Sequence, residues 1–221
     1  MAYETVDARK QFDRWSYCYD CDPLQLLFFR PAHRMLLEAL DRADQHILDI
    51  GCGTCAFAAR VLERSPDVHV WGVDVSDGML RRCHKRRLAA QGRLHLVQAE
   101  GGRLPFKDDA FDAVTCAHSF HHYPRQERAV AEMHRVLRPH GKLLIIDGDP
   151  DHLWGRLLFD VLVVFLEGPV RHLTSRAFCE LYHQAGFENI VQRRRGGPLP
   201  FLLTCGRAVK PGYPTPARRA A

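Results

Sequence analysis

The residues best suited to chemistry form a glycine turn, Asp49 to Cys55, between an apolar run and a helical pattern. Gly51 and Gly53 can adopt backbone angles closed to other residues, so the main chain can approach a ligand closely. The helix that follows directs unpaired backbone N–H groups at the same place. Such a turn is typical of nucleotide binding, although Cys55 stands where the dinucleotide fingerprint has its third glycine.

An acidic residue follows at the distance that such a turn requires. Asp74 ends the next apolar run, 21 residues after Gly53, and an acidic ribose ligand is expected about 20 residues after such a turn. A carboxylate there can accept two hydrogen bonds from a ribose diol. The alternative is that Asp74 is only a helix cap or a turn aspartate, although Ser76 or Asp77 next to it could do the capping.

Three histidines, with Tyr123, follow the fourth predicted strand: His118, His121 and His122. Ligands of open parallel sheets bind at the carboxyl edge of the strands, where these rings would lie. Imidazole titrates near neutral pH, so one of them could act as a general base. The alternative is that they cap backbone groups and line a wall, and the sequence assigns no catalytic residue.

The cysteines do not have the spacing of a metal site. The pairs Cys18/Cys21 and Cys52/Cys55 are separated by 30 residues, whereas a zinc ribbon has roughly 15 to 20. We therefore expect no metal. No secretory signal is visible at the start of the chain, so the eight cysteines are expected to be reduced thiols in the cytoplasm.

Strand and helix patterns alternate around these residues. Strands are predicted at 46–50, 68–73, 94–98, 111–117 and 142–146, with helices at 56–64, 78–91 and 125–137. This alternation predicts right-handed crossovers and a parallel sheet. We expect a single domain at 1–210, followed by a loose tail at 211–221. The domain is divided into a helical leader (1–45), a cofactor-binding core (46–147), a helical insertion on the substrate side (148–174) and a C-terminal helix with two strands (175–210).

The composition is that of an ordinary globular protein, with 46% hydrophobic and 26% charged residues among 221. The most apolar window, Leu157 to Leu166, is about half as long as a membrane span requires, and we predict no span. The basic run Arg81 to Arg87 is expected to be a solvated helix face, so a nucleic-acid partner is not expected. The wider apolar segment, Leu153 to Val170, could line a pocket for an apolar acceptor or could be buried against the sheet.

Five sequence blocks follow one another in a fixed order. They are Leu48 to Thr54, Gly72 to Asp74, Ala99-Glu100 with Leu104 to Phe106, Phe111 to Val114, and Leu137 to Leu143. Together they resemble the class I S-adenosylmethionine-dependent methyltransferases. Phe12-Asp13 and Tyr19-Asp20 are similar to the lead-in of the ubiquinone and menaquinone methyltransferase branch. The resemblance implies a doubly wound, mostly parallel, seven-stranded Rossmann-like α/β sheet with an antiparallel edge strand.

The resemblance also implies a set of cofactor contacts. Asp49 would lie near the methionine amino group, Asp74 would bind the ribose, and Met79 would pack on the adenine unless it is core filler. Glu100 stands where the family commonly has aspartate, and Gly101 could supply the slack for its longer side chain. The expected cofactor-binding residues are Tyr19, Asp49, Gly51, Cys52, Gly53, Thr54, Asp74, Val75, Met79, Ala99, Glu100, Gly101, Ala117 and His118.

The expected activity is transfer of the methyl group of S-adenosylmethionine to a small apolar or aromatic acceptor, on oxygen, nitrogen or carbon, leaving S-adenosylhomocysteine. Such a transfer gains mainly from holding nucleophile and methyl together in a dry pocket. The alternatives are a methyltransferase of RNA or protein, a nicotinamide oxidoreductase, which Cys55 disfavours, and a non-enzymatic S-adenosylmethionine-binding protein. The sequence specifies neither acceptor nor oligomeric state.

The position of Cys52 and Cys55, after a strand and at the start of a helix, is also that of a redox pair. We expect that oxidation of Cys55, or a Cys52–Cys55 bridge, would distort the turn and block cofactor binding. The alternative is that Cys55 simply replaces glycine as a small apolar residue.

Overall fold

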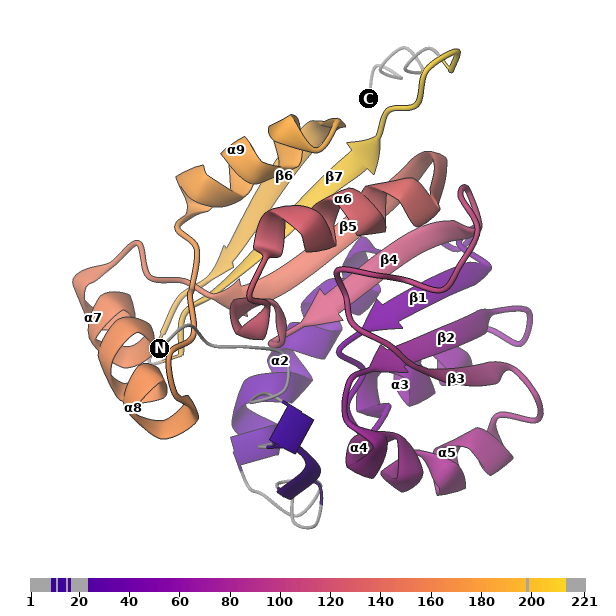
Figure 1. Ribbon diagram of the computed structural model, residues 1–221, viewed down its shortest axis with the longest axis horizontal. Helices are drawn as coiled ribbons and strands as arrows, with labels where there is room; N and C mark the ends of the chain where they lie inside the picture. Colours follow the sequence, from indigo (N-terminus) through magenta and orange to yellow (C-terminus); the bar gives the residue numbers. More distant parts are fainter. Residues whose placement is uncertain (1–8, 11, 15, 17–23, 198, 214–221) are drawn as a thin grey trace.

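The structure, a computed structural model, describes residues 9–10, 12–14, 16, 24–197 and 199–213. Its centre is a seven-stranded sheet in the order β3-β2-β1-β4-β5-β7-β6 (Figure 1). The strands are β1 (His46–Ile50), β2 (His69–Asp74), β3 (Leu94–Gln98), β4 (Phe111–Ala117), β5 (Leu137–Gly148), β6 (Phe187–Arg195) and β7 (Phe201–Ala208). Both the strand count and the turn-flanking strand at 46–50 were predicted from the sequence.

The pairing confirms the predicted sheet. β1 pairs in parallel with β2 and β4, β2 with β3, and β4 with β5. β7 is antiparallel to both β5 and β6, so the antiparallel strand is second from the edge. The strand order reverses on either side of β1, between β2 and β4, which is the switch point where ligands bind in such sheets.

Helices cover both faces of the sheet, as the doubly wound fold requires (Figure 1). One apolar cluster contains buried residues of α2 and α3, and the other contains buried residues of α6 and α9. The helices are α2 (Leu24–Ala39), α3 (Ala56–Arg64), α4 (Asp77–Arg82), α5 (His84–Ala89), α6 (Gln126–Val136), α7 (Leu153–Arg156), α8 (Val164–Glu167) and α9 (Ser175–Gln184), with the short helices η2 (Phe120–His122) and η3 (Leu157–Val163).

The single helix predicted at 78–91 is wrong, because the chain forms two helices, α4 and α5, that meet at Cys83. Cys83 is fully buried and its sulfur is bonded to that of Cys55. Helical periodicity continues through this point, so the pattern alone did not reveal the break.

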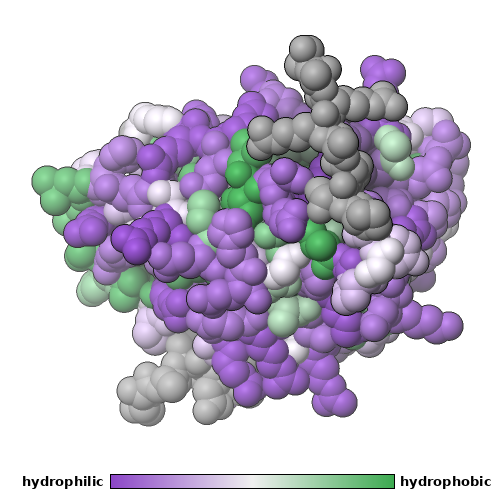
Figure 2. All heavy atoms as spheres, turned by 90° about the horizontal axis from the view of Figure 1, so that it is seen from above, coloured by the Kyte–Doolittle hydropathy of each residue, from purple (hydrophilic) through white to green (hydrophobic). Residues whose placement is uncertain are grey.

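The insertion after β5 is helical, as predicted, but most of its apolar side chains neither wall a pocket nor bury against the sheet. Leu158 and Phe159 are buried. The exposed ones are Leu153, Trp154, Leu157, Val161, Leu162 and Phe165. In Figure 2 a group of hydrophobic atoms stands at the left-hand end of the molecule, the side on which Figure 1 shows α7 and α8. In the described part of the chain, no helix has the length and apolar character to span a membrane.

Candidate active site

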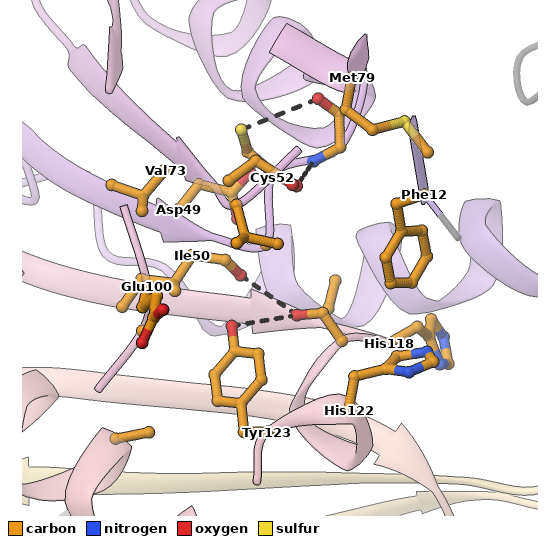
Figure 3. A pocket seen from close by; sticks show the side chains of 18 of the residues that line it. Phe12, Asp49, Ile50, Cys52, Val73, Met79, Glu100, His118, His122 and Tyr123 are labelled. Carbon is orange, nitrogen blue, oxygen red and sulfur yellow. Dashed lines mark hydrogen bonds between the residues drawn. The ribbon is translucent and has the colours of Figure 1, made fainter. Parts of the chain in front are cut away.

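The carboxyl ends of β1, β2 and β4 border one cavity of about 760 Å³ (Figure 3). Of the predicted cofactor-binding residues, Tyr19 lies outside the described residues. All of the others line this cavity: Asp49, Gly51, Cys52, Gly53, Thr54, Asp74, Val75, Met79, Ala99, Glu100, Gly101, Ala117 and His118. Residues from four separate segments of the chain therefore converge on one place, and their roles stay predictions.

The glycine turn has the backbone that its sequence predicts. Gly51, Gly53 and Cys55 have φ values of 69°, 52° and 63°, in the left-handed region. The backbone N–H groups of Gly51 and Cys52 donate to the carbonyl of Val73 at 2.8 and 3.0 Å, which fixes the turn to β2. A Cβ atom on Gly51 would lie 2.2 Å from Ser119 Oγ, so this position has no room for a side chain.

Asp74 is buried against the turn and does not cap the next helix. Its two carboxylate oxygens accept hydrogen bonds from the backbone N–H groups of Gly53 and Ser76, each at 2.8 Å. Ser76 is the residue that caps α4, since its Oγ accepts from the N–H of Met79 at 3.1 Å. Burial raises the pKa of Asp74 to about 6. Asp74 is therefore not the cap of α4, but its bond to the N–H of Ser76 is that of a turn aspartate, and its ribose role stays a prediction.

Asp49 is a second buried acid on the same cavity. Asp49 is 2% exposed, and one of its carboxylate oxygens accepts a hydrogen bond from Thr115 Oγ1 at 2.9 Å. Burial raises its pKa to about 7, opposed by the Thr115 hydrogen bond and increased by the charge of Asp74. A cationic group next to a buried carboxylate stabilises its ionised form. The pair therefore fits a ligand that carries a cation near Asp49 and hydroxyls near Asp74.

Ser119 and Tyr123 line the cavity; Tyr123 was expected at this edge of the sheet, whereas the sequence did not identify Ser119. Ser119 Oγ donates to the carbonyl of Ile50 at 3.3 Å and hydrogen-bonds to the Tyr123 hydroxyl at 3.4 Å, as Figure 3 shows. The Tyr123 ring also packs on Gly101, where a Cβ atom would lie 2.8 Å from its Cε2. Gly101 is therefore needed for close packing, a requirement that its neighbours in sequence do not reveal.

The leader reaches the cavity through Phe12 and Asp13. Phe12 lines the cavity. Asp13 Oδ1 accepts hydrogen bonds from Ser76 Oγ at 2.6 Å and from the N–H of Gly78 at 3.0 Å. The resemblance of this dipeptide to a lead-in thus corresponds to a contact between the leader and the start of α4.

The three candidate histidines divide into two groups. His118 and His122 line the cavity. His121 is not among the cavity residues, and its Nδ1 hydrogen-bonds to Asp147 Oδ1 at 2.7 Å. Neighbouring residues in the sequence thus face different surroundings, because Phe120–His122 forms the tight helix η2.

The expectation that all cysteines are reduced is wrong for two of them. Cys55 and Cys83 form a disulfide with an S–S distance of 2.30 Å, whereas Cys52 is a buried free thiol whose Sγ lies 3.8 Å from that of Cys55. Burial raises the pKa of Cys52 well above its ordinary value, with the charges of Asp74 and Asp49 adding to this effect. Cys55 is bridged to Cys83, the residue after α4, and not to Cys52, so the effect of oxidation on cofactor binding stays a prediction. Cys18 and Cys21 lie outside the described residues.

Replacing Cys83 with alanine should lower the free energy of unfolding under non-reducing conditions. The bridge joins residues 28 positions apart, and a loop of that length corresponds to about 3 to 4 kcal/mol of stabilisation in the chain-entropy model. Denaturant unfolding would measure the difference, which should vanish when a dithiol is added to both proteins. Cys179→Ala, at a half-buried free thiol, is the control. An equal effect of both variants would refute the bridge.

The comparisons with known proteins agree with this geometry. The family model described as "Methyltransferase domain" matches residues 48–145. The ubiquinone/menaquinone biosynthesis C-methyltransferase UbiE of Methylobacterium nodulans is 30% identical over 175 residues, which cover 68% of this chain and 69% of that protein. This chain belongs to the class I S-adenosylmethionine-dependent methyltransferases.

Two further comparisons extend this assignment. The demethylmenaquinone methyltransferase of Thermus thermophilus is 35% identical over 135 residues, which cover 59% of this methyltransferase but only 61% of the Thermus protein, less than two thirds of its length. A Thermotoga maritima structure, described as a possible histamine N-methyltransferase, superimposes with a TM-score of 0.72 at 22% identity. The match covers 89% of this chain and 98% of that one, and it shows a common fold.

Proposed function

We propose that this methyltransferase moves the methyl group of S-adenosylmethionine to a ring carbon of a small quinol-type aromatic acceptor and releases S-adenosylhomocysteine. The observation that carries the proposal is the convergence of the glycine turn, Asp49 and Asp74 on one cavity. The relatives whose printed names specify quinone substrates and C-methylation support the choice of acceptor and atom.

The chain's own residues divide the cavity into two parts. In this proposal Asp74 accepts hydrogen bonds from the ribose diol and Asp49 attracts the methionine amino group. Met79 and Glu100 provide walls for the adenine on the same side. The described residues Phe12, Phe29, His33, His118 and His122 line the rest. Rings of this kind suit a flat aromatic acceptor.

The bound cofactor supplies a sulfonium methyl group that is already electrophilic. The protein therefore contributes mainly orientation and exclusion of water. Ser119 and Tyr123 in the cavity lining are held by hydrogen bonds to the Ile50 carbonyl and to each other. These hydrogen bonds, with those from the glycine turn to the Val73 carbonyl, would hold the cofactor part and the acceptor part of the cavity in a fixed relative position.

The raised pKa of Asp49, about 7, makes cofactor binding depend on pH. A bound ammonium group favours the ionised carboxylate, so binding should release a proton below pH 7. Affinity should rise about tenfold between pH 5.5 and 7.0. The unliganded protein should become less stable over the range from about pH 4 to 7, because its folded state holds the Asp49 proton more tightly than the unfolded state does.

Titration calorimetry in two buffers of different ionisation enthalpy measures the released proton directly. Asp49→Asn should bind more weakly and without the proton release that Asp49 contributes. Proton uptake on binding to the wild type, or an affinity that stays constant from pH 5.5 to 7.0, would refute the placement of the amino group at Asp49.

The acceptor class can be tested by measuring S-adenosylhomocysteine formation with a panel of acceptors. The panel contains a short-chain demethylated naphthoquinol, a benzoquinol, histamine, RNA and a protein extract. We expect S-adenosylhomocysteine to form with a quinol, in equal amount to a product methylated on a ring carbon. Turnover restricted to RNA or protein, or absent with every acceptor, would contradict the proposed function.

A further inference from the structure

A buried carboxylate, Asp147, organises a group of histidines beside the cavity. Asp147 lies near the end of β5 and is 2% exposed. Its oxygens accept hydrogen bonds from the backbone N–H groups of His121 at 3.0 Å and Gly148 at 2.9 Å. Oδ1 also lies 2.7 Å from His121 Nδ1 and 3.9 Å from His172 Nε2. The Asp147 carboxylate therefore lies next to the imidazole rings of His121 and His172.

Asp147 is held ionised in spite of its burial. Burial alone would raise its pKa, but the charge and hydrogen bond of His121, with the charges of His172 and His118, hold the pKa well below its ordinary range. A buried anion of this kind stabilises positive charge on nearby rings.

The rings connect Asp147 to the cavity. The His121 ring packs on His172 and on His122, with both centroid distances 4.3 Å. His172 contacts Phe159 at 4.9 Å, and Phe12 meets the outer side of His122 at 4.8 Å, edge on. His122 is thus fixed between the leader and a stack that ends on a carboxylate, and it lines the cavity.

The backbone that carries His121 and His122 is also fixed. Gln126 Nε2 donates to the carbonyl of Phe120 at 3.1 Å and to that of Arg171 at 2.9 Å. The N–H of Arg171 donates to the carbonyl of His121 at 3.0 Å. These bonds hold η2 against the segment that bears His172, so the ring stack is not free to slide.

His118 has different surroundings, although both rings are among the side chains that line the cavity in Figure 3. Its ring lies between the aromatic rings of Phe29 and Phe201, at centroid distances of 5.3 and 4.6 Å. Its neighbour His33 has a pKa lowered to about 3 by burial and by the charges of Arg60 and His118. His118 is therefore enclosed by aromatic rings, whereas His122 packs on the stack of rings that ends at Asp147.

We infer that His122 is the base that takes the hydroxyl proton of the acceptor, and that His121 and Asp147 are positioning residues that hold its ring and support its charge. This inference rests on the proposed function. It separates the three histidines that the sequence left equivalent, and it assigns a role to a carboxylate that the sequence did not single out.

The proton and electron balance is complete without a further reactant. His122 accepts the hydroxyl proton of the quinol, which leaves an oxyanion whose negative charge extends to the adjacent ring carbon. That carbon forms the bond to the methyl group, and the electron pair of the broken carbon–sulfur bond stays on sulfur. The ring carbon then loses its hydrogen as a proton while the hydroxyl is restored, and His122 returns its proton to solvent. The net release is one proton.

A mutational series with pH–rate profiles tests this assignment. His122→Gln should lower kcat at least 100-fold, with KM for S-adenosylmethionine changed less than threefold. Asp147→Asn should lower kcat about tenfold and shift the acidic limb of the profile to lower pH, because loss of the carboxylate lowers the pKa of a neighbouring imidazole. His121→Asn, whose amide can donate to Asp147, should fall between the two. His183→Gln, on the exposed end of α9, is the control.

Other charged or titratable groups face the same part of the cavity and contribute to any profile. They are His172 before α9, His118 after β4, His33 on α2, Arg125 and Arg128 at the start of α6, Glu100 after β3, Asp49 in β1 and Asp74 at the end of β2. Because Asp147→Asn also changes the surroundings of His121 and His172, the His122 limb is assigned from the titration of the His122 ring itself.

A readout that does not require turnover distinguishes failure of this inference from failure of the proposed function. Nitrogen-15 NMR of the histidine rings should show that His122 titrates at lower pH in Asp147→Asn than in the wild type, with His183 unchanged. An unchanged His122 titration overturns the inference even where no acceptor is methylated. Where an acceptor is methylated, an unchanged kcat in a folded His122→Gln variant overturns the inference. Stoichiometric metal on His121, Asp147 and His172, whose ligand atoms lie within 4.8 Å of one another, also overturns it.

Discussion

Replacing Asp74 with alanine is expected to weaken binding of S-adenosylmethionine at least 100-fold. Each hydrogen bond from a ribose hydroxyl to this carboxylate is of the charged kind, which contributes about 1.5 to 3 kcal/mol, and two of them are lost together. The variant also leaves the N–H of Gly53 without its 2.8 Å acceptor, so the turn loses support where the ligand binds. Titration calorimetry measures the loss of affinity.

The control for this variant is Asp77→Ala, three positions away on the exposed first turn of α4. Asp77 pairs with Arg81 at the surface at 2.7 Å, with its side chain 45% exposed, and exposed pairs contribute little. We expect its affinity to change less than twofold. An Asp74→Ala protein that melts cooperatively and still binds S-adenosylmethionine within threefold of the wild type would contradict the ribose role.

Replacing Gly51 with alanine is expected to be the second most damaging change. The left-handed φ of 69° disfavours any side chain, by about 1 to 2 kcal/mol. The new Cβ would also overlap Ser119 Oγ at 2.2 Å, and Ser119 is held by Ile50 and Tyr123. We expect the free energy of unfolding to fall by about 2 kcal/mol or more and cofactor binding to be lost.

Gly92→Ala isolates the steric part of this effect. Gly92 has a φ of 82°, and a Cβ atom there would meet nothing within 4 Å. It therefore shares the backbone penalty without the overlap, and it lies outside the cavity. Denaturant unfolding and calorimetry on both variants should give a larger loss of stability for Gly51→Ala and a loss of binding for that variant alone. Equal losses of stability with binding retained in both would show that the contact with Ser119 is unimportant.

Much of the fold was predictable because strand and helix patterns report which faces of the chain are buried. The strands at 46–50, 94–98 and 111–117 were predicted to the residue. The turn and Asp74 were predictable because their geometry is local or depends on a fixed spacing. In each case the sequence carries the physical cause within a few residues of the effect.

The remaining features depend on contacts that no local pattern contains. The Cys55–Cys83 bridge joins two helix boundaries 28 residues apart, and only the packing of α4 and α5 brings the sulfur atoms together. Asp147 reads as the end of a strand, but its importance comes from His121 and His172, which arrive from two other elements. A sequence pattern can indicate that a residue is buried, but it does not show which distant residue that residue contacts.

The apolar insertion shows the opposite failure, because its sequence predicted more contact than the structure makes. Leu153 and Phe165 are 88% and 85% exposed, whereas Phe159 is 3% exposed. Apolar composition shows a tendency to be buried and does not show against what.

Calorimetric titration of the wild-type protein with S-adenosylmethionine and, separately, with NADH tests the central claim most directly. Both ligands carry an adenosine that the turn and Asp74 could hold, so the comparison depends on the rest of the cavity. We predict saturable binding of one S-adenosylmethionine per chain, competition by S-adenosylhomocysteine, and no saturable heat with NADH. Saturable binding of NADH together with no response to S-adenosylmethionine would contradict the account.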